Sequence, residues 1–442
     1  MTTTNKSYKT AFIFLTSLFF LWGFITVLVD SLIPRLKEVF TLSYFQAGLV
    51  QFAFFGAYFL LSIPAGNILA KIGYKRGIVL GLVTMALGCL LFYPAASYRI
   101  FGIFMLAYFV LAGGMTLLQV AANPYVAVLG SEEGASSRLN LSQAFNSLGT
   151  TIAPAIGAML ILSDKVKTKE EIASLASAEK EAYFVSEASA VQSPFLSIAF
   201  FVILLAVIFI FVKLPKVMEK IPNKGYKALL SKKSLVMGAI AIFVYVGAEV
   251  AIGSYLVSYF MEMNLAPLIS SNETMMSIAN TIATLFNKTF TNSDPKSLLG
   301  VFVVFYWGGA MIGRFVGAYL TKILSPVKVL GLFASLAILM IIISVSTTGL
   351  MSMWAILAVG LFNSIMFPTI FSLSLEGLDD LKPQASGILC TAIFGGAVIP
   401  PLYGMLVDGL GFKLAFVLIM MCYIYIYYYG RTKSKTSQLE EI

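Results

Sequence analysis

The chain has 442 residues, of which 59% are apolar and only 12% charged, and its formal net charge is +9. A soluble domain has about 25% charged residues, and a single soluble core does not grow to this length at this apolarity. The basic residues lie between apolar runs, so the net charge does not indicate nucleic-acid binding. The chain has no histidine, which excludes a histidine metal site or proton relay, and its three cysteines stand in apolar runs as core residues.

Apolar runs of 18 or more residues recur along the whole length, which predicts an all-α polytopic membrane protein. The first run is too long for the apolar region of a signal peptide and no small-residue cleavage site follows it, so we interpret it as an uncleaved span. We expect twelve spans, at 10–34, 44–69, 78–97, 100–129, 138–162, 194–214, 234–261, 298–321, 327–347, 350–375, 384–408 and 412–429.

Lysine and arginine are divided unevenly between the two sides of these spans. The side with both termini holds 20 of the 30 basic residues, whereas the short loops of the other side hold four. The positive-inside rule therefore predicts a multi-pass protein of the cell (inner) membrane with cytoplasmic termini. A long basic segment predicts a cytoplasmic linker at 213–233, between a six-helix N-terminal half at 1–212 and a six-helix C-terminal half at 234–442.

The two predicted halves resemble each other at a nearly constant offset. Three segments of the first half recur in the second half in the same order: 65–82 pairs with 316–332, 119–124 with 363–368, and 146–157 with 392–404. Parallel halves that meet at a midplane cavity are the major facilitator architecture, in which substrate sites lie at the repeat interface.

Two carboxylates interrupt apolar runs inside the predicted spans. Asp30 follows FFLWGFITVLV in the first span, and Glu249 stands within FVYVGAEVAIGSYLVSYF in the seventh. A carboxylate at that depth costs about 2.5–3.5 kcal/mol and usually faces a functional cavity. The alternative is a structural ion pair, but we expect no basic residue at mid-span, since Arg314 lies near the cytoplasmic end of the eighth span. We therefore expect both acids to be functional and without an ionic partner.

The repeat relates the two acids to each other. Corrected for the longer external loop after the seventh span, the offset places the counterpart of Asp30 near residue 256, within about two helical turns of Glu249. Both acids can therefore face one central cavity from opposite halves. An unpaired carboxylate there can exchange a proton near neutral pH, or an ionised one can help to hold sodium. We assign both acids to cation coupling.

Amide side chains gather in the fourth and fifth spans. Gln119 and Asn123 lie in the fourth, and Gln143 and Asn146 share one face of the fifth because they are three residues apart. Amides both donate and accept hydrogen bonds, which suits a neutral polyhydroxylated ligand. The alternative for each is a hydrogen bond between helices. We expect Gln119, Gln143 and Asn146 to bind substrate, with Asn123 as a further substrate-binding candidate.

Two further candidates remain open between a ligand role and a packing role. Asn363 of the tenth span could bind substrate or join helices. Trp22 lies eight residues before Asp30 on the same face, where its ring could stack on a sugar or pack against the wall.

Several stretches together resemble the fucose–galactose–glucose:cation symporter family of the major facilitator superfamily, over nearly the whole chain. They are SLFFLWGFITVLVDSLIP, FQAGLVQFAFFGAYFLLSIPAG, GMTLLQVAANPYVAVLG, SRLNLSQAFNSLGTTIAP, YVGAEVAIGSYL and FPTIFSLSLEGL. The resemblance implies two pseudo-symmetric six-helix halves and secondary active transport by alternating access. The loop GNILAKIGYKR is similar to the superfamily signature G-x-L-A-D-R-x-G-R-[KR], but Ala70 stands at its acidic position, which argues against the usual charge latch there.

The resemblance also implies roles for single residues. In fucose-transporting members, a first-span aspartate and a fourth-span glutamate serve the proton and the sugar; Asp30 matches the former and Gln119 replaces the latter. Gln143 and Asn146 match amides of the sugar cavity. Phe367 replaces a tyrosine beside the tenth-span proline and is a substrate-binding candidate at that position. These departures, with QVAANPY and YVGAEV, favour the glucose/galactose branch, in which Glu249 supplies the second acid. We expect Glu249 to combine a sugar-binding role with a coupling role.

The sequence therefore predicts symport of a neutral hexose such as glucose or galactose with a proton, or with sodium, and without a cofactor or metal. We expect a monomer in the lipid bilayer. Symport of L-fucose or another monosaccharide, a facilitative uniporter and a drug exporter remain as alternatives, although an exporter cavity would be largely apolar. An intramembrane aspartyl protease would need two aspartates and a glycine-rich motif, so we do not expect an enzyme.

Overall fold

A computed structural model describes residues 3–39, 44–161, 172, 174–217, 225–285 and 295–440. This part of the chain is helical and contains no strand. Eleven of its segments are long and apolar enough to cross a membrane, and α5 (Ala135–Ile161) is the twelfth long helix. The expected all-α architecture of twelve membrane helices is confirmed.

Each half contains six membrane-spanning segments. The N-terminal half consists of α1 (Thr3–Val39), α2 (Tyr44–Ile72), α3 (Tyr74–Tyr98), α4 (Phe101–Val128), α5 (Ala135–Ile161) and α7 (Ser177–Phe211). The short α8 (Tyr226–Leu230) precedes the C-terminal half. That half consists of α9 (Lys233–Glu262), α10 (Leu265–Ser270), α11 (Glu273–Leu285), α12 (Pro295–Ile323), α13 (Pro326–Ser346), α14 (Gly349–Asn363), α15 (Met366–Leu375), η1 (Asp379–Leu381), α16 (Lys382–Thr391), η2 (Ala392–Phe394), α17 (Gly395–Leu410) and α18 (Phe412–Glu440).

Three predicted spans differ clearly from the observed helices. The eleventh, expected as one helix at 384–408, is divided into α16, η2 and α17. The sixth span was expected at 194–214, but α7 already begins at Ser177, because alanine and glutamate in SAEKEAYFVSEASA favour helix outside the apolar segment. The tenth span, expected as one helix at 350–375, is divided into α14 and α15. Pro368 lies in the first turn of α15, where its missing N–H ends the hydrogen-bond ladder of the preceding helix.

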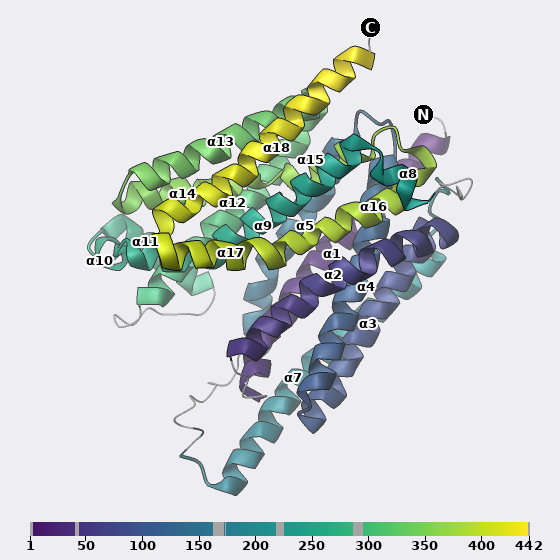
Figure 1. Ribbon diagram of the computed structural model, residues 1–442. Coiled ribbons are helices and arrows are strands. Elements are labelled where there is room, and N and C mark those ends of the chain that lie inside the picture. The colour runs from purple at the N-terminus through teal and green to yellow at the C-terminus, as the bar shows by residue number, and fades with distance from the viewer. Residues whose placement is uncertain are drawn as a thin grey trace.

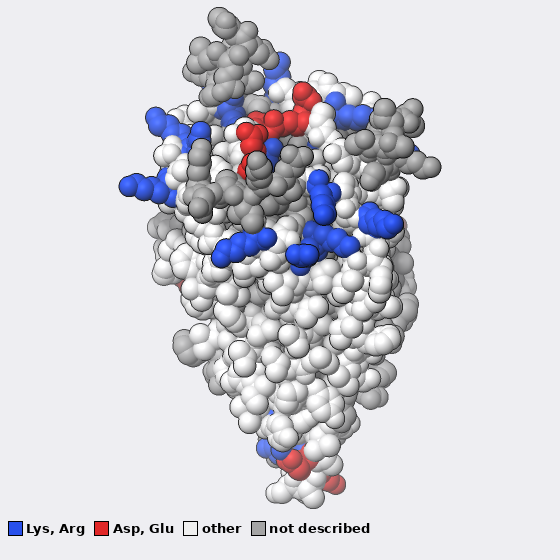
Figure 2. All heavy atoms as spheres, turned by 90° about the vertical axis from the view of Figure 1, so that its right-hand side faces the viewer, with Lys and Arg blue, Asp and Glu red and all other residues white. Residues whose placement is uncertain are grey.

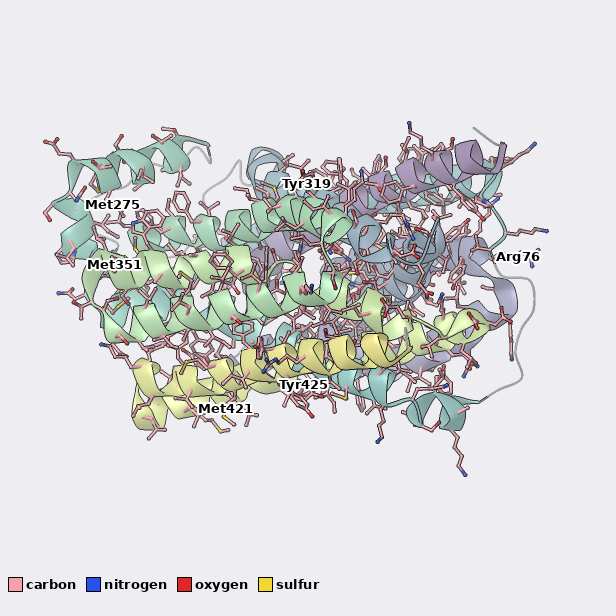
Figure 3. All side chains as sticks on the ribbon, turned by 90° about the horizontal axis from the view of Figure 1, so that it is seen from above. Arg76, Met275, Tyr319, Met351, Met421 and Tyr425 are labelled. Carbon is pink, nitrogen blue, oxygen red and sulfur yellow. The ribbon has the colours of Figure 1, made fainter. Side chains whose placement is uncertain are left out.

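The two halves form a V that is closed at the end where both termini lie (Figure 1). At that end α2 packs against α16, and α5 packs against α12. Hydrogen bonds cross between the halves there: Ser136 and Ser372 share one at 2.6 Å, Ser137 Oγ donates to the Ala318 carbonyl at 2.7 Å, and Asn140 Nδ2 donates to Thr369 Oγ1 at 3.0 Å. Figure 3 shows Arg76 at this end and Met275 of α11 at the opposite end.

The helix α8 fastens the connection between the halves to α2. Tyr226 Oη donates a hydrogen bond to the Ile63 carbonyl at 2.7 Å. Burial raises the pKa of Tyr226 to about 12.

Helices α1 and α5 approach each other at two glycines. A Cβ on Gly149 would lie 2.2 Å from the Phe20 carbonyl oxygen, and a Cβ on Gly23 would lie 2.3 Å from the Asn146 carbonyl oxygen. Only glycine allows backbones to approach this closely. The contact fixes the position of Asn146 relative to α1.

The surface has the charge distribution of a membrane protein. In Figure 2, Lys and Arg gather at the end where the termini lie, and a broad band with almost no charge separates them from a second charged region at the opposite tip. Large apolar side chains on the outer helix faces are exposed to the surroundings, among them Phe200, Leu332 and Leu414. This band fits the hydrocarbon layer of a bilayer.

Candidate functional site

A charged cluster joins the two halves at the contact of α5 with α12. Glu249 of α9 and Arg314 of α12 form an ion pair, with Nη2 3.7 Å from Oε1. Arg314 Nη1 also donates a hydrogen bond to Ser147 Oγ of α5, in the opposite half. The two charged side chains are only 14% and 15% exposed. Arg314 therefore connects a largely buried acid of one half to a hydroxyl of the other.

The expectation that Glu249 lacks an ionic partner was wrong, and the break in the tenth span explains why. Because Pro368 has no N–H, the carbonyl of Ser364, four residues earlier, has no helical donor. Arg314 Nε donates to this carbonyl at 3.1 Å. The guanidinium has five donor hydrogens and can serve this carbonyl, Ser147 and Glu249 together.

Aromatic hydroxyls surround Glu249 within its own half. Tyr245, one helical turn earlier, donates to Glu249 Oε1 at 2.7 Å, and Tyr306 of α12 donates to the Glu249 backbone carbonyl at 3.3 Å. Asn363 Nδ2 donates to Tyr306 Oη at 2.8 Å and to Tyr423 Oη at 3.3 Å. Asn363 is fully buried, and its Oδ1 has no hydrogen-bond partner within the described residues. Asn363 therefore joins Tyr306 of α12 to Tyr423 of α18.

The amides of the N-terminal half connect neighbouring helices. Gln119 Nε2 donates to Tyr58 Oη of α2 at 2.9 Å, and Gln143 Nε2 of α5 donates to Asn123 Oδ1 of α4 at 3.3 Å. Asn146 Nδ2 donates to the Phe19 carbonyl of α1 at 2.9 Å. Asn123 is fully buried and its Nδ2 has no partner within the described residues, whereas Gln119 and Asn146 retain partial exposure.

The two aromatic candidates are largely buried. Trp22 contacts Phe19 edge to face, with ring centroids 5.5 Å apart, and Phe367 packs on Phe371 at 5.7 Å. The side chain of Asp30 lies outside the described residues.

Sequence reasoning did not identify Arg314 and the tyrosines as part of this cluster. Tyr245 had a usable signal, since a spacing of four residues places it on the same helix face as Glu249. The contacts of Arg314 and Tyr306 depend on how α12 packs against α9 and α14, which residue spacing within one helix cannot predict.

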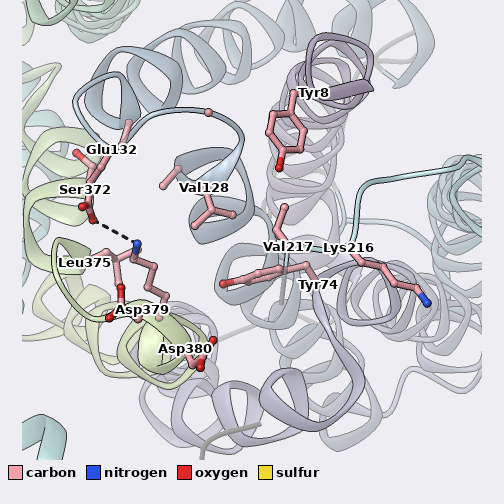
Figure 4. Close-up of a pocket in the computed structure, with 14 residues that line it drawn as sticks. Tyr8, Tyr74, Val128, Glu132, Lys216, Val217, Ser372, Leu375, Asp379 and Asp380 are labelled. Atoms are coloured by element: carbon pink, nitrogen blue, oxygen red, sulfur yellow. Dashed lines mark hydrogen bonds and ion pairs between the residues drawn. The ribbon is translucent and has the colours of Figure 1, made fainter. Parts of the chain in front are cut away.

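A second polar contact closes the end of the molecule where the termini lie. Glu132, between α4 and α5, accepts hydrogen bonds from the Gly377 backbone N–H and from Lys382 Nζ, both at 3.3 Å. It borders a cavity of about 610 Å³ between the halves (Figure 4). Burial raises the pKa of the nearby Glu376 carboxyl, and Lys433, 3.3 Å away, opposes that shift. Glu132 supplies at this end an acidic contact between the halves that Ala70 cannot make.

We expect Glu132→Gln to open this end modestly. Its side chain is half exposed, so the ion pair contributes about 0.2–1 kcal/mol, which corresponds to less than about a fivefold change in population. Alkylation of a Ser372→Cys reporter by N-ethylmaleimide should accelerate by that factor, over a low background from the three buried native cysteines. Glu181→Gln, which breaks the ion pair with Arg99 elsewhere on the surface, is the matched control and should leave the rate unchanged. Equal alkylation rates in the reporter protein, its Glu132→Gln variant and its Glu181→Gln variant would show that Glu132 does not hold this end closed.

Comparison with known proteins agrees with this architecture. The sequence profile of the Major Facilitator Superfamily matches residues 10–401. The chain is 48% identical to a glucose/galactose transporter of Brucella abortus over 98% of this chain and 97% of the relative. It is 43% identical to a putative glucose/galactose transporter of Helicobacter pylori over 94% and 95% of the two chains. It is 34% identical to the L-fucose-proton symporter of Escherichia coli K12 over 98% and 95%.

A crystal structure of FucP, a Major Facilitator Superfamily transporter in the outward conformation, superimposes with a TM-score of 0.85 at 32% identity, over 97% of this chain and 99% of FucP. The chain is therefore a membrane transporter of the major facilitator fold and not an enzyme. Within that superfamily it belongs to the fucose–galactose–glucose:cation symporter family, as the sequence motifs predicted.

Proposed function

We propose that this protein takes up a neutral hexose, glucose or galactose, by symport with a cation, and that the coupling cation is a proton. The observation that carries the proposal is the Glu249–Arg314 pair, hydrogen-bonded through Arg314 to Ser147 of the opposite half. The relatives named glucose/galactose transporters, at 48% and 43% identity over nearly the whole chain, support the choice of sugar.

The pair links cation binding to the contact between the halves. While Glu249 is charged, it attracts Arg314, which also donates to Ser147 and so bridges α12 to α5. A proton on the carboxylate removes this attraction and frees the guanidinium. Since alternating access requires the halves to rock against each other, a change in this bridge biases the conformational equilibrium.

The proposed orientation places both termini in the cytoplasm. The basic residues gathered at that end support it through the positive-inside rule (Figure 2). The halves are then closed toward the cytoplasm, which corresponds to a state ready to load from outside. The likeness to FucP in its outward conformation supports the same assignment.

We expect Gln143→Ala to weaken sugar binding at least about fivefold. Gln143 contacts Asn123 through Nε2 and keeps a side-chain oxygen for a sugar hydroxyl, and one lost hydrogen bond in a desolvated site costs about 1–3 kcal/mol. Asn146→Ala removes the bond to the Phe19 carbonyl, so we expect it to lower thermal stability as well as affinity. Gln192→Ala, at a partly exposed residue bonded to Ser97, is the matched control. Unchanged sugar affinity in both site variants would make the amides structural.

Uptake into proteoliposomes tests the proposed function. Labelled glucose, galactose and L-fucose are offered under proton and sodium gradients that are imposed independently. We expect glucose and galactose to accumulate above equilibrium with an inward proton gradient alone. Accumulation driven by sodium alone would show that the coupling cation is sodium and not a proton. Accumulation of fucose alone would show that the substrate is fucose. Uptake that only reaches equilibrium would indicate a uniporter.

A further inference from the structure

Five basic residues surround one cavity beside the cytoplasmic ends of α2, α3 and α7. The cavity has a volume of about 800 Å³. Its charged lining consists of Lys71, Lys75, Arg76, Lys213 and Lys216, and none of the lining residues that the structure describes is acidic. The ion pairs found in the described part of the chain involve none of these five residues.

The cavity is held in shape by contacts of other groups. Lys75 Nζ donates to the Ile210 carbonyl at 2.7 Å, and Tyr125 Oη donates to the Pro215 carbonyl at 2.8 Å, which fixes the segment after α7 against α3 and α4. The rings of Tyr74 and Tyr125 stack with centroids 5.1 Å apart. These contacts engage only one cation, Lys75, and they keep the others close together.

The remaining cations are available to a ligand. Lys71, Arg76, Lys213 and Lys216 are exposed. Figure 3 shows Arg76 at the outer edge of this end, and in Figure 4 the Lys216 side chain points away from Asp379 and Asp380 of the neighbouring cavity. Like charges held together repel one another, and a bound anion relieves that repulsion.

The exposed surface next to the cavity is apolar. Phe211, two residues before Lys213, is 79% exposed, and Ile210 is 52% exposed. On α3, Leu80 follows Arg76 by one helical turn and is also exposed. These side chains belong to the uncharged band that faces lipid. A ligand that fits both surfaces has an anionic head and long apolar chains.

We propose that this basic cavity, defined by Lys71, Lys75, Arg76, Lys213 and Lys216, binds the phosphate headgroup of an anionic phospholipid whose acyl chains lie along α3 and α7. Basic pockets between membrane helices on the cytoplasmic side recognise such headgroups, and each nearby cation adds to the attraction. The apolar surface beside the cavity selects a membrane lipid over a soluble phosphate.

Native mass spectrometry of the full-length protein with added phosphatidylglycerol or phosphatidylcholine tests the proposal. The variant K71Q/R76Q/K213Q/K216Q removes the four exposed cations of the basic cavity and keeps the Lys75 contact. The matched control K227Q/K232Q/K233Q/K328Q removes four exposed cations that do not line it. A third variant, K71R/K213R/K216R, keeps the charge.

We expect the wild type, the control and the arginine variant to retain one tight phosphatidylglycerol, and the cavity variant to bind it at least about tenfold more weakly. Higher salt should weaken binding to the wild type. Equal losses in the cavity variant and the control, or equal affinity of the wild type for phosphatidylcholine, would overturn the site. Displacement of the lipid by millimolar glycerol phosphate would show a site for soluble phosphate and overturn the lipid assignment. Thermal unfolding shows whether the cavity variant is folded. If it is not, the lipid affinity of the arginine variant and the salt dependence of wild-type binding test the site instead.

Discussion

Asp30→Asn is expected to abolish the accumulation of sugar against its gradient while exchange of sugar across the membrane continues. Asparagine has nearly the same shape as aspartate but can neither release a proton nor carry a charge. If Asp30 is the coupling acid of the first span, the variant keeps a sugar pathway and loses the link to the cation gradient. Proteoliposomes measure both quantities, as uphill uptake under an imposed gradient and as counterflow without one.

Asp408→Asn is the matched control for this experiment, because Asp408 lies at the end of α17 and outside the charged cluster. It should accumulate sugar at close to the wild-type rate. Uphill uptake by Asp30→Asn at an undiminished rate would remove Asp30 from the coupling mechanism. Loss of both uptake and counterflow, with normal folding, would assign it to sugar binding instead.

Much of the fold could be predicted from the sequence because hydropathy and helix length report directly on membrane spans. The division of the tenth span was not predicted, although Pro368 was visible, because a proline can kink a helix, cap it or start a new one. The early start of α7 was missed for a related reason. Hydropathy locates the apolar part of a helix but does not detect polar turns that continue the helix beyond it.

The candidate site was only partly predictable. An acid in an apolar run is conspicuous, so Glu249 could be singled out without a structure. Its partner could not, because Arg314 was interpreted by its distance from the end of a span. Its contacts depend on the Ser364 carbonyl, which Pro368 leaves free between α14 and α15. The amides illustrate a further limit. Helix spacing placed Gln143 and Asn146 on one face, but their neighbours Asn123 and Phe19 come from different helices.

Glu249→Gln is expected to have the second large effect. It leaves Arg314 largely buried without its counter-charge, and removing one partner of a fully buried pair costs about 3–5 kcal/mol. The remaining bonds of Arg314 to Ser147 and Ser364 and its partial exposure place the cost at the lower end of that range. Thermal unfolding measures it, and sugar affinity and ion dependence of uptake show the role. A proton carrier predicts loss of the pH dependence, a sodium ligand a higher sodium requirement, and a sugar ligand weaker binding with coupling intact.

The double variant E249Q/R314Q separates the coupling role from a structural one. Removing both charges leaves no uncompensated buried cation, which is the main cost of removing one partner of such a pair. We therefore expect thermal stability to recover most of the loss seen in Glu249→Gln, while accumulation against a gradient stays absent because no carboxylate remains at this position. If the double variant regained both stability and gradient-driven accumulation, the pair would serve only to hold α9 against α12, and Asp30 would be the sole coupling acid. Recovery of stability without coupling would place the second coupling acid at Glu249.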